Sequence, residues 1–136
     1  MLRQKHTLFL RSKEVVNCGW NRGERIALIL RCKEKKTSLY FDTVCHMASS
    51  DYNDYGDVTY RLDADKARTV GMSESTDNKA VGLWSGGKSI PVIKQMLGKN
   101  EMVVRMTPYG QSPFTASFKI AGLSDAIKPI REECKW

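Results

Sequence analysis

Apolar and polar residues alternate along much of this chain, which is the spacing of β-strands with one buried face. In Asp57–Asp63, for example, every second residue (Val58, Tyr60 and Leu62) is apolar. Similar patterns predict further strands over Arg25–Cys32, Thr37–Thr43, Ala67–Met72, Lys79–Trp84, Glu101–Thr107 and Phe114–Ile120. The first two flank four charged residues, Lys33–Lys36, so we expect a hairpin in which the numbers of paired residues sum to about 69.

Two short segments have helical spacing instead. The first is Ser89–Leu97, where Ser89 can cap the helix, Pro91 is tolerated in the first turn and Gly98 can end it. The second segment follows Gly122 and carries apolar residues at Leu123, Ala126, Ile127 and Ile130. Strands separated by turns, with two short helices of which one is C-terminal, predict a mainly β (α+β) fold. We expect a small antiparallel β-sandwich-like domain.

Length and charge add an expected division of the chain. With 136 residues, 41% hydrophobic and 27% charged, the chain is of ordinary size and composition for one domain. The formal net charge is +7, and residues 1–40 carry all of this excess, with ten Lys/Arg against three Glu. We therefore divide the sequence into a basic N-terminal arm, residues 1–17, and a single β-rich domain, residues 18–136.

Such a basic stretch raises the question of nucleic-acid binding. Its cations are not interleaved with aromatic residues as in single-strand binders, and they form no helix-turn-helix or zinc-finger pattern. We therefore favour a solvated surface, or one that attracts anionic envelope polymers. The apolar patch Leu8–Leu10 is shorter than the apolar region of a secretory signal, so the sequence leaves open whether a leader was removed or the protein stays in the cytoplasm.

The four cysteines predict a disulfide framework. Cys18, Cys32, Cys45 and Cys134 have no zinc-site spacing, and an even number suits two disulfides in an oxidising compartment. Four buried free thiols are the alternative. In the expected hairpin Cys32 lies at the turn and Cys45 near the opposite end, too far apart to bridge. Cys18 and Cys45 fall at one end, which predicts the pairs Cys18–Cys45 and Cys32–Cys134.

A resemblance to a known family rests on the order of six blocks rather than on any one of them. The blocks are Ile26–Cys32, Asp57–Asp63, Ser73–Trp84, Ser89–Leu97, Glu101–Gly110 and Ala116–Trp136, which ends in Cys-x-Trp. In this order they resemble the type VI secretion-associated TagO/VasI accessory family. The resemblance implies a small protein of the bacterial envelope. It finds no counterpart for the first 17 residues, and relatives also occur outside secretion clusters, including on mobile elements.

One motif favours a different chemistry. Gly82–Ser89 matches the phosphate-binding P-loop, in which Gly82 and Gly87 shape the turn, Lys88 contacts phosphate oxygens and Ser89 holds magnesium. A P-loop normally closes the first strand of a parallel αβ sheet, whereas β-like segments precede this one. A tight strand-to-helix turn needs the same residue types, so we disfavour nucleotide binding.

Metal binding and catalysis have weaker support. Asp51–Asp57 fits part of a calcium-binding EF-hand loop, but Tyr55 and Leu62 stand where ligands are needed. His6 lies in the predicted arm and His46 beside a predicted disulfide, and no set of residues supplies a nucleophile, a base and an oxyanion donor together. We expect no metal, no cofactor and no enzymatic activity.

The sequence therefore predicts a non-enzymatic accessory or binding protein of the cell envelope, whose partner is an envelope protein or a cell-wall polymer. Polar residues on the predicted sheet and its loops are the candidate binding surface: Arg61, Asp63, Ser75, Asp77, Asn78 and Arg105. Two alternatives remain. One is a cytoplasmic, phage-type inhibitor of a host protein or nucleic-acid complex, and the other is a small P-loop nucleotide-binding protein.

Overall fold

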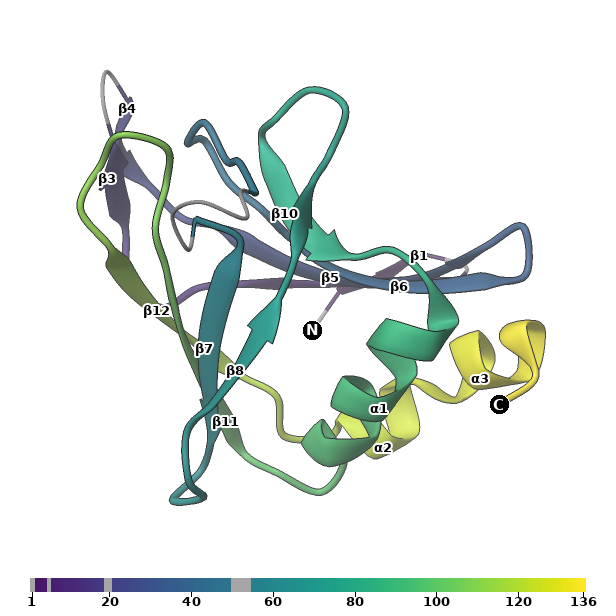
Figure 1. Ribbon diagram of the computed structural model, residues 1–136. Coiled ribbons are helices and arrows are strands. Elements are labelled where there is room, and N and C mark those ends of the chain that lie inside the picture. The colour runs from purple at the N-terminus through teal and green to yellow at the C-terminus, as the bar shows by residue number, and fades with distance from the viewer. Residues whose placement is uncertain (1, 5, 19–20, 50–54) are drawn as a thin grey trace.

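Two antiparallel sheets pack face to face in the computed structural model, which describes residues 2–4, 6–18, 21–49 and 55–136 (Figure 1). The larger sheet contains, in spatial order, β1 (Leu2–Gln4), β2 (Thr7–Arg11), β5 (Ala27–Lys33), β6 (Lys36–Asp42), β10 (Ala80–Leu83) and β9 (Ser73–Glu74). The smaller contains β12 (Phe114–Lys119), β11 (Glu101–Met106), β7 (Asp57–Leu62) and β8 (Arg68–Gly71). A separate pair is formed by β3 (Val16–Cys18) and β4 (Asn21–Glu24). The predicted mainly β, sandwich-like fold is confirmed.

The hairpin β5–β6 has the predicted register but a shorter turn. Ala27 pairs with Asp42 and Cys32 with Thr37, so the paired numbers sum to 69 in both cases. The predicted four-residue loop is wrong, because Lys33 and Lys36 also pair and leave Glu34 and Lys35 as the turn. Both turn residues have positive φ, 52° and 64°, as a two-residue hairpin turn that follows the strand twist requires.

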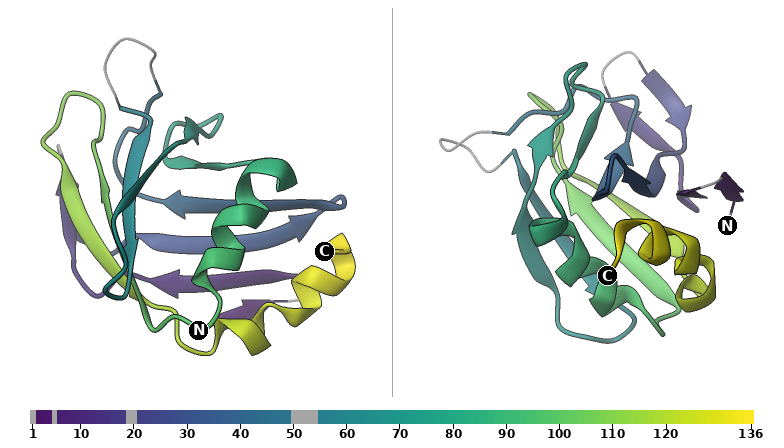
Figure 2. Two further views of the ribbon diagram at one scale, coloured as in Figure 1. Left: turned by 60° about the horizontal axis from the view of Figure 1, so that its bottom comes forward. Right: turned by 90° about the vertical axis from the view of Figure 1, so that its right-hand side faces the viewer.

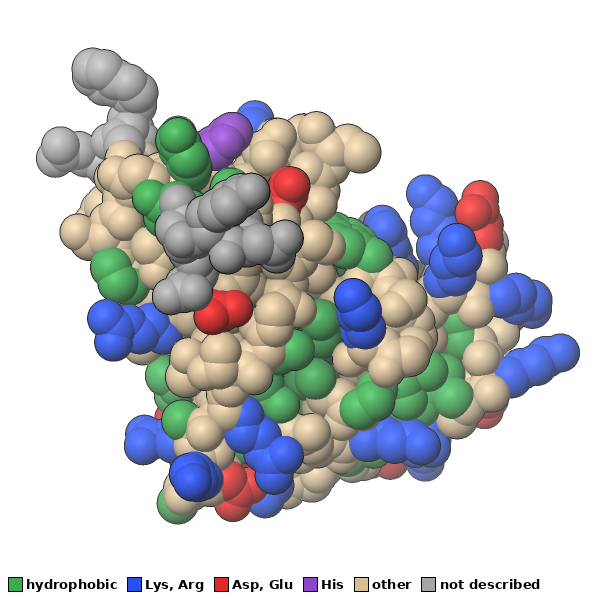
Figure 3. Space-filling view, viewed as in Figure 1, with side chains coloured by type: hydrophobic (Ala, Val, Ile, Leu, Met, Phe, Trp, Pro, Cys, Tyr) green, Lys and Arg blue, Asp and Glu red, His purple; other side chains and the backbone are tan. Residues whose placement is uncertain are grey.

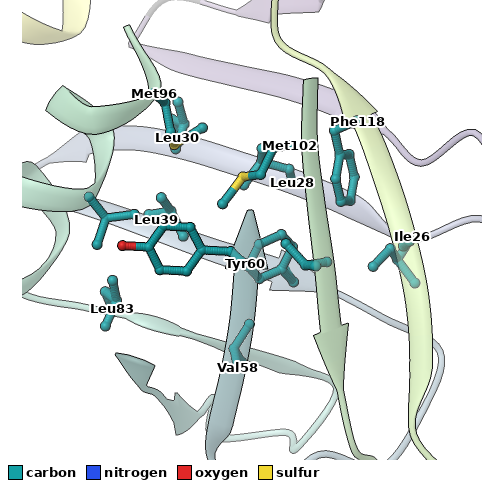
Figure 4. Close-up of a cluster of buried hydrophobic side chains, with 14 of the residues drawn as sticks. Ile26, Leu28, Leu30, Leu39, Val58, Tyr60, Leu83, Met96, Met102 and Phe118 are labelled. Atoms are coloured by element: carbon teal, nitrogen blue, oxygen red, sulfur yellow. The ribbon is translucent and has the colours of Figure 1, made fainter. Parts of the chain in front are cut away.

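The core lies between the two sheets and follows the alternation in the sequence. Every second residue of β7 (Val58, Tyr60 and Leu62) is buried, and Figure 4 shows Val58 and Tyr60 facing side chains from the larger sheet. At another point the rings of Phe41 and Phe118 join the sheets, with centroids 5.7 Å apart. Burial of this apolar surface is the main source of the fold's stability.

Helix α1 (Gly86–Met96) packs against β6 and β10, and it begins earlier than the sequence predicts. The N-cap is Ser85, whereas Ser89 lies inside the helix, fully buried, and donates its hydroxyl to the carbonyl of Thr37 at 2.7 Å. The prediction that Ser89 caps the helix is therefore wrong. Pro91 accordingly lies in the second turn rather than the first.

The C-terminal segment is held by the predicted disulfide. It consists of α2 (Leu123–Ala126) and α3 (Lys128–Cys134), which lie beside α1 at the open end of the sandwich (Figure 2). Cys134 is bonded to Cys32, and Trp136 donates its indole N–H to the Thr37 hydroxyl at 2.9 Å. The second predicted pair, Cys18–Cys45, is also bonded, so the connectivity is confirmed.

The basic N-terminal stretch is joined to the domain. Thr7–Arg11 forms β2 and pairs with β5, so these residues of the predicted arm belong to the larger sheet. Beyond β2, the amide of Lys13 donates to the Ser117 carbonyl at 2.9 Å, and the Glu14 carboxylate accepts bonds from the amide (2.7 Å) and hydroxyl (2.5 Å) of Ser117. This segment therefore covers the outer edge of β12.

Candidate functional site: a groove beside strand β8

Two pockets lie between residues 65–73, which include β8, and residues 82–95, which include most of α1. We call them upper and lower as they lie in the view of Figure 1. The upper pocket has a volume of about 630 Å³ and lies between Gly71–Ser73 and Leu83–Gly86. The lower pocket, about 160 Å³, lies between the start of β8 and the side chain of Gln95 near the end of α1. The end of β8 and the start of α1 thus meet at the upper pocket, and the start of β8 and the end of α1 meet at the lower one, so the strand and the helix run in opposite directions. We call the two pockets together the β8 groove.

Two buried side chains with apolar groups lie at the base of the groove and form its floor. Leu83 lines the upper pocket and Tyr60 the lower, and Figure 4 shows the Tyr60 ring directed towards Leu83 and Leu39. The Tyr60 hydroxyl donates to Oε1 of Gln95 at 2.7 Å. Hydrophobic side chains are visible at the base of the hollow between β8 and α1 in Figure 3.

An aromatic stack forms one wall of the upper pocket. Trp84 lines the pocket, and its ring lies on that of Tyr40 with centroids 4.9 Å apart. The indole N–H of Trp84 donates to the Ser73 carbonyl at 2.9 Å. Tyr40 lies close against Gly82, its partner on β10, and only a residue without a side chain fits there, because a Cβ atom at Gly82 would lie 2.4 Å from the Cβ of Tyr40. The Arg31 guanidinium covers the Tyr40 ring at 5.0 Å from its centroid. These contacts fix the wall before any ligand arrives.

The groove is positively charged. Lys36 and Lys88 line the upper pocket, and none of the described residues in its lining is an acid. Glu74, next to this lining, is hydrogen-bonded by the Ser49 hydroxyl, and that bond lowers the pKa of the Glu74 carboxyl. In the lower pocket Lys66 and Arg68 accompany one acid, Asp65, whose carboxylate is paired with Lys99 at 2.8 Å. The charge and the buried apolar groups at the base together suit an anionic ligand with apolar groups.

Three of the sequence-predicted site residues form a turn between β9 and β10. The Ser75 hydroxyl donates to the Asp77 carboxylate at 2.7 Å, and that carboxylate also accepts the Lys79 amide at 3.0 Å. The Ser75 hydrogen bond, followed by that from Lys79, lowers the pKa of the Asp77 carboxyl. Asn78 has a positive φ of 59° and donates its side-chain amide to the Met47 carbonyl at 3.1 Å. Their polar groups therefore shape this turn.

The other three lie on or beside the smaller sheet. Asp63, with φ 52°, accepts bonds from the amides of Asn100 (3.1 Å) and Glu101 (2.8 Å), which join the end of β7 to the start of β11. Arg61 and Arg105 are exposed and lie on one face, because Arg61 pairs with Val103, two residues before Arg105 on β11. The structure brings the two arginines onto one surface, away from the turn.

The P-loop match has the wrong surroundings for phosphate binding of that kind. β10, which carries Gly82, is antiparallel to both β6 and β9, whereas the P-loop fold needs a parallel sheet. The buried Ser89 hydroxyl is committed to the Thr37 carbonyl, so it is not directed at a magnesium ion. Gly87 and Lys88 lie in the first turn of α1, and only Lys88 faces the groove.

The histidines and possible metal ligands are dispersed. His6 Nε2 lies 3.8 Å from a Glu133 carboxylate oxygen, and the His46 ring meets the ring of Tyr109 edge-on at 5.7 Å. Among the described residues, no three His, Cys, Asp or Glu side chains are grouped as metal ligands would be. Positions 50–54 of the loop considered for calcium lie outside the described residues.

Sequence reasoning missed the groove because its parts are distant along the chain. It identified the strand Ala67–Met72 and the residue Lys88 separately, for other reasons. Nothing in the sequence alone places Trp84 opposite Ser73 or Gln95 opposite Tyr60. The Gly-Gly pair at positions 86–87 was a partial signal of the groove, because a helix starts there and Lys88 follows directly.

Comparison with known proteins adds a family. The model of the family described as "Type VI secretion system VasI, EvfG, VC_A0118" matches residues 11–136. Neither a curated protein nor a solved structure matches the chain. Among the described residues, no helix has the length and apolar character needed to cross a bilayer.

Proposed function

Because the chain belongs to the family of the type VI secretion system proteins VasI and EvfG, we propose that it is a non-enzymatic accessory protein of that system that works in the periplasm. In this proposal it binds an envelope partner through the β8 groove. The family supplies the connection to type VI secretion, and the disulfides and the groove support the compartment and the mode of action.

The observation that carries this proposal is the pair of disulfides. All four cysteines are bonded, and Cys32–Cys134 fixes the C-terminal helix to the central hairpin across a sequence separation of 102 residues. Disulfides of this structural kind form and persist in oxidising compartments such as the periplasm. A β-sandwich that carries a charged groove on a disulfide-bonded frame suits a binding role.

The test is complementation from two compartments. A strain that lacks the gene receives the chain either behind a cleavable secretion leader or without any leader, and the activity of its type VI system is measured by killing of a competitor. The exported form should restore killing and the leaderless form should not. Restoration by the leaderless form alone would contradict the proposal and favour the cytoplasmic inhibitor alternative.

A variant separates the role of the groove from that of the compartment. Lys36→Glu with Lys88→Glu reverses the charge of the upper pocket and should reduce killing by the exported form. Lys94→Glu, on the same helix but outside the lining of both pockets, is the matched control and should complement fully. If the exported wild type, the Lys36→Glu/Lys88→Glu variant and the Lys94→Glu variant all kill equally well, the groove has no part in the function.

A further inference from the structure

We infer that the β8 groove takes an extended, acidic peptide segment of a partner protein, which adds to β8 as a further strand. This inference rests on the proposed binding role and names the chemistry of the partner. It follows from three features of the described residues: an open strand edge, buried apolar side chains at the base of the groove and an excess of basic over acidic side chains in its lining.

The first feature is the open edge of β8. β8 is the last strand of the smaller sheet, and three of its four residues are exposed, with Val70 half-buried. At the opposite end of this sheet, β12 is covered by the Lys13 and Glu14 contacts with Ser117. Among the described residues no strand pairs with the outer side of β8, so this is the side of the sheet at which another strand can pair.

The direction of the β8 backbone groups follows from its pairing. The Met72 amide donates to the Gly56 carbonyl at 2.7 Å, so this pair is hydrogen-bonded towards β7. Hydrogen-bonded and non-hydrogen-bonded pairs alternate in antiparallel sheets, so Thr69 and Gly71 belong to the second kind. The 3.0 Å contact between the Thr59 and Thr69 hydroxyls agrees, because side chains approach more closely in such pairs. The amides and carbonyls of Thr69 and Gly71 thus point away from β7.

Helix α1 lies along this open edge and forms the second wall. Lys88 lines the upper pocket and Gln95 the lower, and residues seven apart lie on one face of a helix. An extended chain between β8 and α1 would pair its backbone with Thr69 and Gly71. Alternate side chains would then point to the floor formed by Leu83 and Tyr60. Backbone pairing supplies affinity in this mode of recognition, and the pockets supply specificity.

The charge of the lining selects acidic residues in the occupant. Lys36 and Lys88 flank one end, and Lys66 and Arg68 flank the other, with Asp65 already paired to Lys99. Charge complementarity of this kind chooses the partner and speeds its encounter. We therefore expect acidic residues towards the ends of the segment and apolar residues at alternate positions in its middle.

The experiment uses the full, disulfide-bonded chain and a displayed library of random linear peptides. Enriched peptides should combine acidic with alternating apolar residues, and their synthetic forms should bind with a Kd in the micromolar range. Thr69→Pro, which removes the outward amide, should weaken binding about tenfold or more. Thr69→Val keeps that amide and removes only the hydroxyl, so it is the matched control and should bind like the wild type.

A second measurement leaves the protein unchanged, in case Thr69→Pro fails to fold. The bound peptide is N-methylated at single positions, which removes one amide donor at a time. Methylation should weaken binding at every second position, on the side that faces β8, and have little effect between these positions. Uniform tolerance of methylation would overturn the inference.

Other occupants give different results. Concentration-dependent dimerisation that Thr69→Pro abolishes would overturn the inference in favour of a second copy of the chain. A polyanion without amide groups, such as polyphosphate, that competes and is lost with Lys36→Glu/Lys88→Glu but not with Thr69→Pro would overturn it in favour of an anionic polymer. Absence of any enriched peptide would also overturn it. If no peptide is enriched but the exported protein still restores killing, only the peptide inference fails. If peptides bind the groove but the exported protein does not restore killing, only the proposed function fails.

Discussion

The Tyr60 hydroxyl donates to Oε1 of Gln95 at 2.7 Å, so a side chain of the smaller sheet is tied to the helix that packs on the larger sheet. The bond crosses the floor of the β8 groove. It joins the floor of the groove, on β7, to helix α1, which forms one wall.

Tyr60→Phe keeps the buried ring and removes this bond. We expect the free energy of unfolding to fall by about 1 kcal/mol, the usual net value of one such hydrogen bond. Chemical denaturation measures the change. Tyr109→Phe is the control, since that side chain is 58% exposed and should give a change near zero. Equal effects at both positions would show that the Tyr60 bond contributes nothing specific.

Ser89→Ala tests the assignment of the P-loop serine to a structural role. Its buried hydroxyl donates to the Thr37 carbonyl, and removal leaves that carbonyl without this partner, so stability should fall by about 1–2 kcal/mol. Ser85→Ala is the matched control, because the N-cap side chain makes no capping bond. If Ser89→Ala is as stable as the wild type, and ATP with magnesium raises the melting temperature of the wild type, the nucleotide-binding hypothesis would be supported instead.

The two disulfides should differ in their contribution to stability. In the chain-entropy account, stabilisation grows with the closed loop, to about 3–4 kcal/mol for Cys18–Cys45 and about 4–5 kcal/mol for Cys32–Cys134. The sequence separations are 27 and 102 residues. Paired Cys→Ser variants, unfolded in denaturant, measure both values. A larger loss for the Cys18–Cys45 pair would contradict this order.

The Glu14–Ser117 contact predicts a pH dependence. Desolvation raises the pKa of the Glu14 carboxyl, but the hydrogen bonds from the Ser117 hydroxyl and amide outweigh it, so the pKa is lowered. A lowered folded-state pKa gives a stabilising contribution that is present above the unfolded-state pKa and is lost as the pH falls through the folded-state value. Glu14→Gln should therefore destabilise the protein at pH 7 and bring its stability closer to that of the wild type at pH 3.

Denaturation of the two proteins at both pH values tests this. A constant difference between them would contradict a role for the Glu14 charge. Glu24→Gln is a convenient control, since no described residue holds that exposed carboxylate in a comparable contact.

The surface predicted from the sequence can be separated from the groove. Arg61→Ala with Arg105→Ala removes two exposed charges from one face of the smaller sheet and should leave the melting temperature unchanged. The groove account expects groove peptides to bind this variant normally. If pull-down of the envelope partner instead weakens with the arginine variant and not with Lys36→Glu/Lys88→Glu, the arginine face is the interface.

Local patterns in the sequence were sufficient to predict the strands and the disulfide pairs. The alternation of Val58, Tyr60 and Leu62 identified β7 and its buried face, and the register of the hairpin excluded a bond between Cys32 and Cys45. The start of α1 was missed because Gly86 and Gly87 have low helix propensity, and tertiary packing on β6 and β10 overrides it.

The groove lay beyond sequence reasoning for a different reason. Its existence depends on the order of strands in two sheets, which leaves β8 at an edge and brings residues 83–95 beside it. The roles of Asp63 and Asn78 were also hidden, because positive φ angles and bonds to distant backbone groups leave little trace in composition.

The proposed function requires that this protein works in an oxidising compartment with both disulfides formed. The most direct measurement is the intact mass of the protein recovered from its own cells, quenched in acid and alkylated under denaturing conditions with and without prior reduction. We expect no label without reduction and four labels after it. Four labels without reduction would mean that the cysteines are free thiols in the cell, and the periplasmic role would then be wrong.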